Sequence, residues 1–106
     1  MNNKNMKKIF VCSKLRGNIE NNIKRTKEFC REVCLEGNVP IAPHIYLTQF
    51  LNELNENERN LGIDYGIELL KNCDELWIFD KDISSGMQKE INIAKKLNIK
   101  IVKKWK

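Results

Sequence analysis

The chain has 106 residues, of which 42% are hydrophobic and 31% charged, and its formal net charge is +5. This length favours one domain with a hydrophobic core that needs no disulfide staples. No apolar run approaches the roughly 20 residues of a membrane helix, and no signal-peptide pattern opens the chain, so we expect a cytoplasmic protein without a membrane partner. We interpret residues 1–106 as a single domain and expect the polar residues 1–5 to be disordered.

The four cysteines and the single histidine do not indicate a metal site. The sequence has no C-x-x-C pair and His44 is its only histidine, so we expect neither metal nor cofactor. Cys30 and Cys34 share a helix face, and we interpret them as buried apolar residues in a reducing compartment. The lysines favour an anionic partner, but no aromatic platform or groove-reading motif accompanies them. A small molecule is therefore favoured over nucleic acid.

The first half of the chain predicts a strand, a helix and a second strand. Residues 7–13 are a continuous apolar run between charged residues, typical of a strand buried on both faces of a parallel sheet. Asn18 is a good N-cap for the helix that follows, and Gly37 is placed to end it. Residues 39–42 form the second strand. Pro40 predicts an edge position for that strand because proline cannot donate to the ladder.

The second half begins with a long connection. Pro43 stops the second strand, and the apolar residues within 46–54 predict a short helix. A connection of this length is typical of a segment that covers a functional site, and its apolar residues favour a homodimer or larger assembly. The remaining elements are expected as a helix over 58–72, a strand over 75–79, a helix over 86–97 and a strand over 99–102.

This alternation predicts an α/β fold. We expect a three-layer, flavodoxin/Rossmann-like domain with a four-stranded, mainly parallel sheet of order 2-1-3-4 and helices on both faces. The order reverses between strands one and three. Ligands in such sheets bind in the crevice beyond the carboxyl ends of the strands at that point.

Two loops at this crevice carry polar candidates. Ser13, Arg16 and Gly17, with the start of the first helix, form either an anion-binding cradle or a plain turn with a surface arginine. His44 and Tyr46 border the same crevice. We expect His44 to titrate near neutrality and either to contact a phosphate or base or to be satisfied structurally.

The third loop leads to Glu90. Ser84, Ser85 and Gly86 precede it, and we expect the amide groups at the start of the helix to hold Glu90 ionised. An ionised carboxylate so placed can attack an anomeric carbon. The alternative is a surface glutamate on an amphipathic helix.

Three further residues flank this loop. Asp80 and Asp82 either cap the loop or bind substrate hydroxyls. Trp77, inside the preceding strand, is interpreted as a core residue rather than a stacking platform.

These segments together carry a resemblance. V-C-S-K-L-R-G-N, A-P-H and C-D-E-L-W-I-F, followed by S-x-G-x-x-x-E-x-x-x-A, are similar to segments of the nucleoside 2-deoxyribosyltransferase-like superfamily. That superfamily includes deoxynucleoside 5′-monophosphate N-glycosidases and small bacterial and phage proteins. The resemblance spans residues 8–102.

The resemblance implies roles for particular residues. Glu90 matches the nucleophile, Ser84 a serine that helps to bind the phosphate, and Ser13, Arg16 and Gly17 the phosphate-side loop. It implies attack of the carboxylate on C1′, a covalent glycosyl-enzyme intermediate, and release to water or to a second base.

The chain departs from the superfamily at one catalytic position. The superfamily places an aspartate eight residues before the residue that here is Asp74, and this position is Gly66. Asp64 and Glu68 flank it on one helix face. Either a one-turn adjustment lets Asp64 act as the acid that protonates the departing base, or that function is missing. The transferases also use a C-terminal extension that reaches a neighbouring subunit's site, whereas this chain stops at residue 106, which argues against the transferase proper.

Three functional hypotheses remain open. The leading one is an N-glycosidase of a nucleotide or nucleoside. The second is a non-catalytic binder that senses or sequesters a nucleotide-derived signal, with a phage-derived signal as one alternative, and Gly66 favours it. The third is a basic protein associated with nucleic acid.

Overall fold

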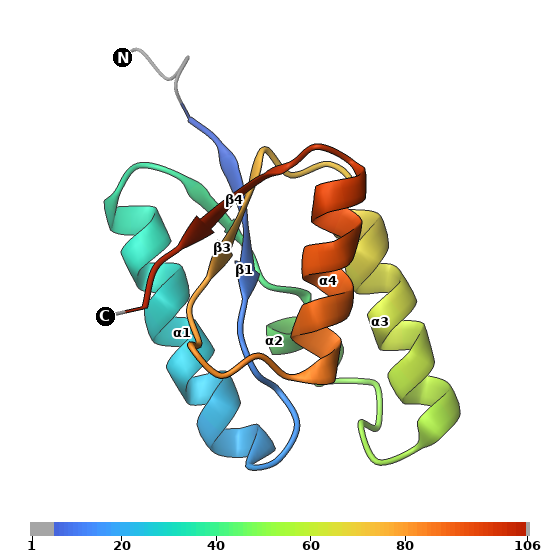
Figure 1. The fold of residues 1–106 in the computed structure, drawn as a ribbon. Helices are drawn as coiled ribbons and strands as arrows, with labels where there is room; N and C mark the ends of the chain where they lie inside the picture. The colour runs from blue at the N-terminus through green and yellow to red at the C-terminus, as the bar shows by residue number, and fades with distance from the viewer. Residues whose placement is uncertain (1–5, 106) are drawn as a thin grey trace.

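The computed structural model describes residues 6–105, and it contains a single parallel sheet (Figure 1). Its strands are β1 (Lys8–Cys12), β2 (Val39–Ile41), β3 (Glu75–Ile78) and β4 (Lys100–Lys103). The order is β2-β1-β3-β4 with every pair parallel, so the predicted fold class and strand order are confirmed. The strand that contains Pro40 lies at an edge, as predicted. The expectation for residues 1–5 falls outside the described residues.

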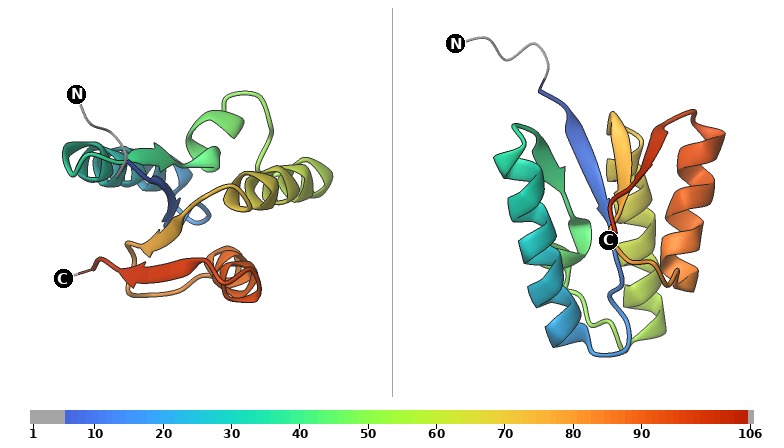
Figure 2. Two further views of the ribbon diagram at one scale, coloured as in Figure 1. Left: turned by 90° about the horizontal axis from the view of Figure 1, so that it is seen from above. Right: turned by 60° about the vertical axis from the view of Figure 1, so that its left-hand side comes forward.

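Four helices connect the strands. They are α1 (Ile19–Leu35), α2 (Pro43–Leu47), α3 (Glu56–Leu70) and α4 (Ser85–Lys96). α1 packs on one face of the sheet, and α3 and α4 pack on the other (Figure 2). Within residues 6–105, none of the helices has the length and apolar character needed to cross a membrane.

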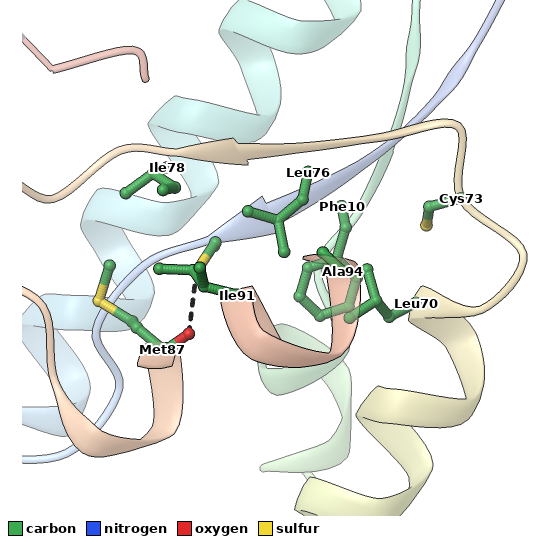
Figure 3. Packing of buried hydrophobic residues seen from close by; sticks show 9 residues of the cluster. Phe10, Leu70, Cys73, Leu76, Ile78, Met87, Ile91 and Ala94 are labelled. Carbon is green, nitrogen blue, oxygen red and sulfur yellow. Dashed lines mark hydrogen bonds between the residues drawn. The ribbon is translucent and has the colours of Figure 1, made fainter. Parts of the chain in front are cut away.

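The alternation of side chains along the two central strands divides the core into two clusters. Ile9 and Val11 of β1 face α1, whereas Phe10 and Cys12 face α3 and α4. On the second side, Phe10 packs with residues of β3, α3 and α4 (Figure 3). Because both faces of β1 are buried from Ile9 onward, the strand is continuously apolar over residues 9–12 rather than alternating.

The two residues predicted to begin and end the first helix lie at the ends of α1. The Asn18 side chain accepts a hydrogen bond from the Asn21 amide at 3.1 Å, and Gly37 follows α1 with φ of 88°. A positive φ of this size strains most residues with a Cβ, which explains the glycine. Ser84 caps α4 by accepting from the Met87 amide at 3.2 Å, so this helix begins one residue earlier than predicted.

The segment after β2 differs from the prediction. Pro43 does not simply stop the strand; it begins α2, and residues 48–54 form turns rather than the predicted helix. Proline suits the first turn of a helix because its φ is fixed near the helical value. The N–H that it lacks would have no helical partner in that turn.

Residues 48–55 form a loop, here called the flap, that leads into α3. The Glu58 carboxylate accepts from the Asn52 amide at 2.7 Å, and the Asn55 side chain accepts from the Glu58 amide at 3.0 Å. These two bonds fix the flap to the first turn of α3, whose N-cap is Asn55.

Candidate active site

A cleft lies at the carboxyl ends of the strands. It is lined by the loop after β1, α2, the flap, α3 and the start of α4. In Figure 1 the loop after β1, α2 and the start of α4 lie below the sheet. The cleft and its open mouth together enclose about 770 Å³ of space free of protein atoms, part of which is open solvent. It occupies the crevice that the strand order predicts.

Most of the candidate residues line this cleft, and four do not. Those that line it are Ser13, Arg16, His44, Ser84, Ser85, Gly86 and Glu90. Gly17, Tyr46, Asp64 and Asp80 are not among its lining residues. The structure therefore brings together residues from three separate segments, namely the loop after β1, α2 and the start of α4.

Glu90 is the sixth residue of α4 and is half-buried. Burial raises its pKa to about 8, and the neighbouring Cys12 thiol lowers it only in part. The expectation that the helix amides hold Glu90 ionised is therefore wrong. Their field acts within the first turn, and Glu90 lies beyond it against the sheet.

Ser13 and His44 of the cleft wall form a hydrogen-bonded cluster with the buried Thr26. Ser13 Oγ lies 2.8 Å from Thr26 Oγ1, and His44 Nε2 lies 3.2 Å from the same Thr26 oxygen. Thr26 donates to the Asn22 carbonyl at 2.8 Å, so it accepts from its other partners. This cluster fixes the positions of Ser13 and the imidazole.

The imidazole of His44 is neutral at pH 7. Burial lowers its pKa to about 4, although the Asp80 carboxylate opposes the shift. The expectation that His44 titrates near neutrality is therefore wrong. A neutral ring can donate or accept a hydrogen bond in the cleft but brings no charge to a phosphate.

Asn22 holds the loop after β1. Its side-chain amide donates to the Leu15 and Arg16 carbonyls, at 3.0 Å each. Arg16 is exposed and lines the cleft, where its guanidinium is available to an anion. Gly17 has φ of 100° and forms the turn itself.

Asp80 positions the loops instead of lining the cleft. Its carboxylate pairs with Arg25 of α1 and accepts from the Lys14 amide at 2.8 Å. Asp82 is exposed and bonds to Lys14 Nζ at 2.9 Å. Of the two roles considered for these aspartates, the observed contacts match the structural one.

The start of α4 supplies donors to the cleft. Because Ser84 Oγ accepts from the Met87 amide, its own hydroxyl hydrogen remains to be donated. The amides of Ser85 and Gly86 lie in the first turn, where no helical acceptor exists. Hydroxyl and amide donors at a helix N-terminus suit a negatively charged ligand group.

The structure places the predicted acid away from the cleft. Asp64 is on the exposed side of α3, and Glu68, also exposed, pairs with Lys71 at 3.2 Å. Gly66 does line the cleft, and a Cβ added there would lie 3.8 Å from Pro43, an ordinary contact. The acid role of Asp64 stays a prediction.

Two charged residues of the cleft were missed from the sequence. Glu53, on the flap, and Arg59, on α3, have side chains that are 16% and 21% exposed, and Glu53 Oε1 lies 3.5 Å from Arg59 Nε. Burial raises the pKa of Glu53, against the opposing effect of Arg59 and Arg16. In the sequence these two residues are marked only by the run E-L-N-E-N-E-R. Its charged and polar residues are typical of a solvated surface.

Other residues take structural positions. Trp77 is buried and its Nε1 donates to Glu75 Oε1 at 2.8 Å, as expected for a core residue. Tyr46 is half-exposed, with its ring 6.1 Å from that of Phe50. The expected burial of Cys34 is wrong, because it lies on the outward side of α1. Among residues 6–105, no three His, Cys, Asp or Glu side chains gather into a metal-binding group.

Solved structures share this fold. A 2-deoxyribosyltransferase from Bacillus psychrosaccharolyticus has a TM-score of 0.66 and 14% identity, over 92% of this chain and 72% of that one. A 2-desoxiribosyltransferase from Leishmania mexicana has a TM-score of 0.63 and 17% identity, over 93% of this chain and 64% of that one. At these identities the likeness shows the fold alone, and it agrees with the superfamily resemblance at that level.

Sequence comparison gives the family. No curated protein matches the chain. The family described as Domain of unknown function (DUF7768) matches residues 7–104, nearly the whole chain. The protein therefore belongs to that family.

Proposed function

We propose that the protein is an N-glycosidase that cleaves the bond between sugar and base of a nucleoside monophosphate or deoxynucleoside monophosphate, with Glu90 as the nucleophile. The observation that carries the proposal is the position of Glu90 in the wall of a cleft that also holds Arg16 and the donors at Ser84 to Gly86. The likeness in fold to two deoxyribosyltransferases supports the same chemistry.

The arrangement suggests how a substrate would lie. The hydroxyl of Ser84, the first amides of α4 and the Arg16 guanidinium would receive the phosphate. Glu90, further along the same helix, would then face the sugar. Attack of its carboxylate on C1′ forms a glycosyl ester as the base departs, and water or a second acceptor later takes the sugar.

The raised pKa of Glu90 constrains this mechanism. A nucleophile must be ionised, and with a pKa of about 8 roughly one tenth of Glu90 is ionised at pH 7. Positive charge develops at the sugar during the reaction and favours the ionised form of Glu90. Substrate binding and reaction therefore both oppose the effect of burial on the Glu90 pKa.

Substitution of Glu90 tests the proposal. Base release from a panel of nucleoside and deoxynucleoside monophosphates, followed by liquid chromatography, should occur with wild-type protein and vanish with Glu90→Ala. Lys89→Ala, at the neighbouring exposed position of α4, is the matched control and should retain activity. Absence of base release by wild-type protein across the panel would overturn the proposal.

A second candidate is a non-catalytic binder of a nucleotide-derived signal. Glycine at position 66 and the exposed position of Asp64 favour it, because neither supplies an acid to the cleft. Isothermal calorimetry separates the two hypotheses: a binder returns its ligand intact after tight binding, whereas the enzyme releases the base.

We also infer a homodimer, since Phe50 and Leu54 of the flap are 65% and 82% exposed. Light scattering at micromolar protein concentration tests this, and a monomer mass would contradict it.

A further inference from the structure

We propose that Glu53 is the proton donor to the departing base, in the role that the superfamily resemblance assigns to an aspartate at the position of Gly66. This inference rests on the proposed function. It concerns a residue of the flap that no sequence motif marks.

The inventory of carboxyl groups in the cleft supports it. Among the described residues that line the cleft, only Glu53 and Glu90 carry one. They come from different elements, the flap and α4. Cleavage of a glycosidic bond by this route needs two carboxyl groups in one site, one as nucleophile and one as acid and base.

The surroundings of Glu53 suit a proton donor. Its side chain is 16% exposed, and its nearest cation, Arg59 Nε, lies 3.5 Å away and forms no hydrogen bond within the described residues. A tight, hydrogen-bonded pair would hold Glu53 ionised, whereas this loose one leaves the protonated form accessible. Burial raises the pKa of Glu53, although Arg59 and Arg16 oppose the shift.

The proposed steps balance in protons and electrons. The C1′–N bond breaks as Glu90 forms an ester at C1′; the bonding pair stays on the base nitrogen, and the base receives the proton of Glu53. Water then attacks C1′, Glu53 takes a proton from that water, and the ester bond to Glu90 breaks. Both carboxyl groups end as they began.

Few other groups of the cleft titrate in the relevant range. His44 is neutral above about pH 4. Cys12, behind Glu90, keeps its proton because burial and the Glu90 charge raise its pKa. The productive form of the pair carries one proton, on Glu53, with Glu90 ionised.

Glu53→Gln is the test, with the fastest substrate of the panel. Loss of the acid should lower kcat by about 10²-fold or more. A substrate whose leaving group needs no proton should lose far less: a 7-methylguanine nucleotide for purines, or a 4-nitrophenyl glycoside of the same sugar for pyrimidines. Glu56→Gln, three residues away and exposed, is the matched control and should behave as wild type.

The pH profile separates an acid from a structural residue. Wild-type activity should fall above about pH 8, where no carboxyl proton remains, whereas Glu53→Gln with the activated substrate should rise through that pH as Glu90 ionises. A structural defect would lower both substrates equally and keep the wild-type profile, which would overturn the inference.

The remaining outcomes are also decisive. Activity abolished by Glu90→Ala but unchanged by Glu53→Gln would overturn this inference alone. A larger loss in Asp64→Asn than in Glu53→Gln would assign the acid to α3 instead. Absence of base release by wild-type protein would overturn the proposed function and this inference with it.

Discussion

The guanidinium of Arg25, on α1, pairs with the buried carboxylate of Asp80, at the end of β3. The same carboxylate accepts a hydrogen bond from the Lys14 amide in the loop after β1. One side chain thus joins a helix and two loops on the cleft side of the sheet. The shape of the cleft depends on a residue that does not line it.

Removal of this carboxylate should destabilise the protein. Asp80→Ala leaves the Lys14 amide without its acceptor and Arg25 without its partner, so the free energy of unfolding should fall by about 2–3 kcal/mol. Urea denaturation measures the change. Asp82→Ala, which removes an exposed ion pair with Lys14, is the control and should change little. Equal effects of the two substitutions would contradict this assignment.

The single histidine makes the protonation of His44 directly observable. In a proton NMR titration, its imidazole signals should show a midpoint near 4 instead of near 6.5. Because the unfolded state takes up the proton first, stability should fall as the pH drops from about 6.5 to about 4, by up to about 3 kcal/mol. His44→Gln should remove this loss. A midpoint close to 6.5 would contradict the buried cluster.

Glu90 should give the opposite pH dependence. Its pKa is about 8 in the folded protein against 4.5 in a model compound, so the folded state holds the proton more tightly. Stability should therefore be greatest below about pH 4.5 and should decrease as the pH rises to about 8. The difference in unfolding free energy between wild type and Glu90→Gln, measured from pH 5 to 8, isolates this effect. A difference that does not vary with pH would contradict it.

Two glycines should respond to alanine with opposite signs. Gly66 is helical, and its added Cβ would meet only Pro43 at 3.8 Å, so Gly66→Ala should stabilise by about 0.5–1 kcal/mol. Gly37 has φ of 88°, and Gly37→Ala should destabilise by about 1–2 kcal/mol. Thermal unfolding of both variants gives the comparison. Destabilisation by Gly66→Ala would mean that Pro43 cannot accommodate the methyl group.

Local patterns in the sequence were enough for the fold. Pro40 predicts an edge strand because it lacks a donor, and Asn18 and Gly37 predict helix ends because a side-chain acceptor and a positive φ are needed there. These properties belong to single residues and their immediate neighbours. Pro43 was the exception, since the same ring suits the end of a strand and the start of a helix.

The electrostatics of the cleft could not be predicted in this way. The sequence predicts an ionised Glu90 and a His44 whose pKa is near neutrality. Burial moves both pKa values further than any nearby charge does. Burial of a carboxyl or imidazole depends on which distant segments pack around it. Glu53 was missed for the same reason, because its flap meets the cleft only once α3 is in place.

The hydrogen bonds among Asn52, Asn55 and Glu58 also determine how the flap moves. The first turn of α3 and the final residues of the flap are ordered by the same contacts, so they should form and fray as one cooperative unit. Glu53 stands next to Asn52 within that unit. A substitution at Glu58, outside the cleft, should therefore speed hydrogen exchange across the flap and loosen the placement of the Glu53 carboxyl.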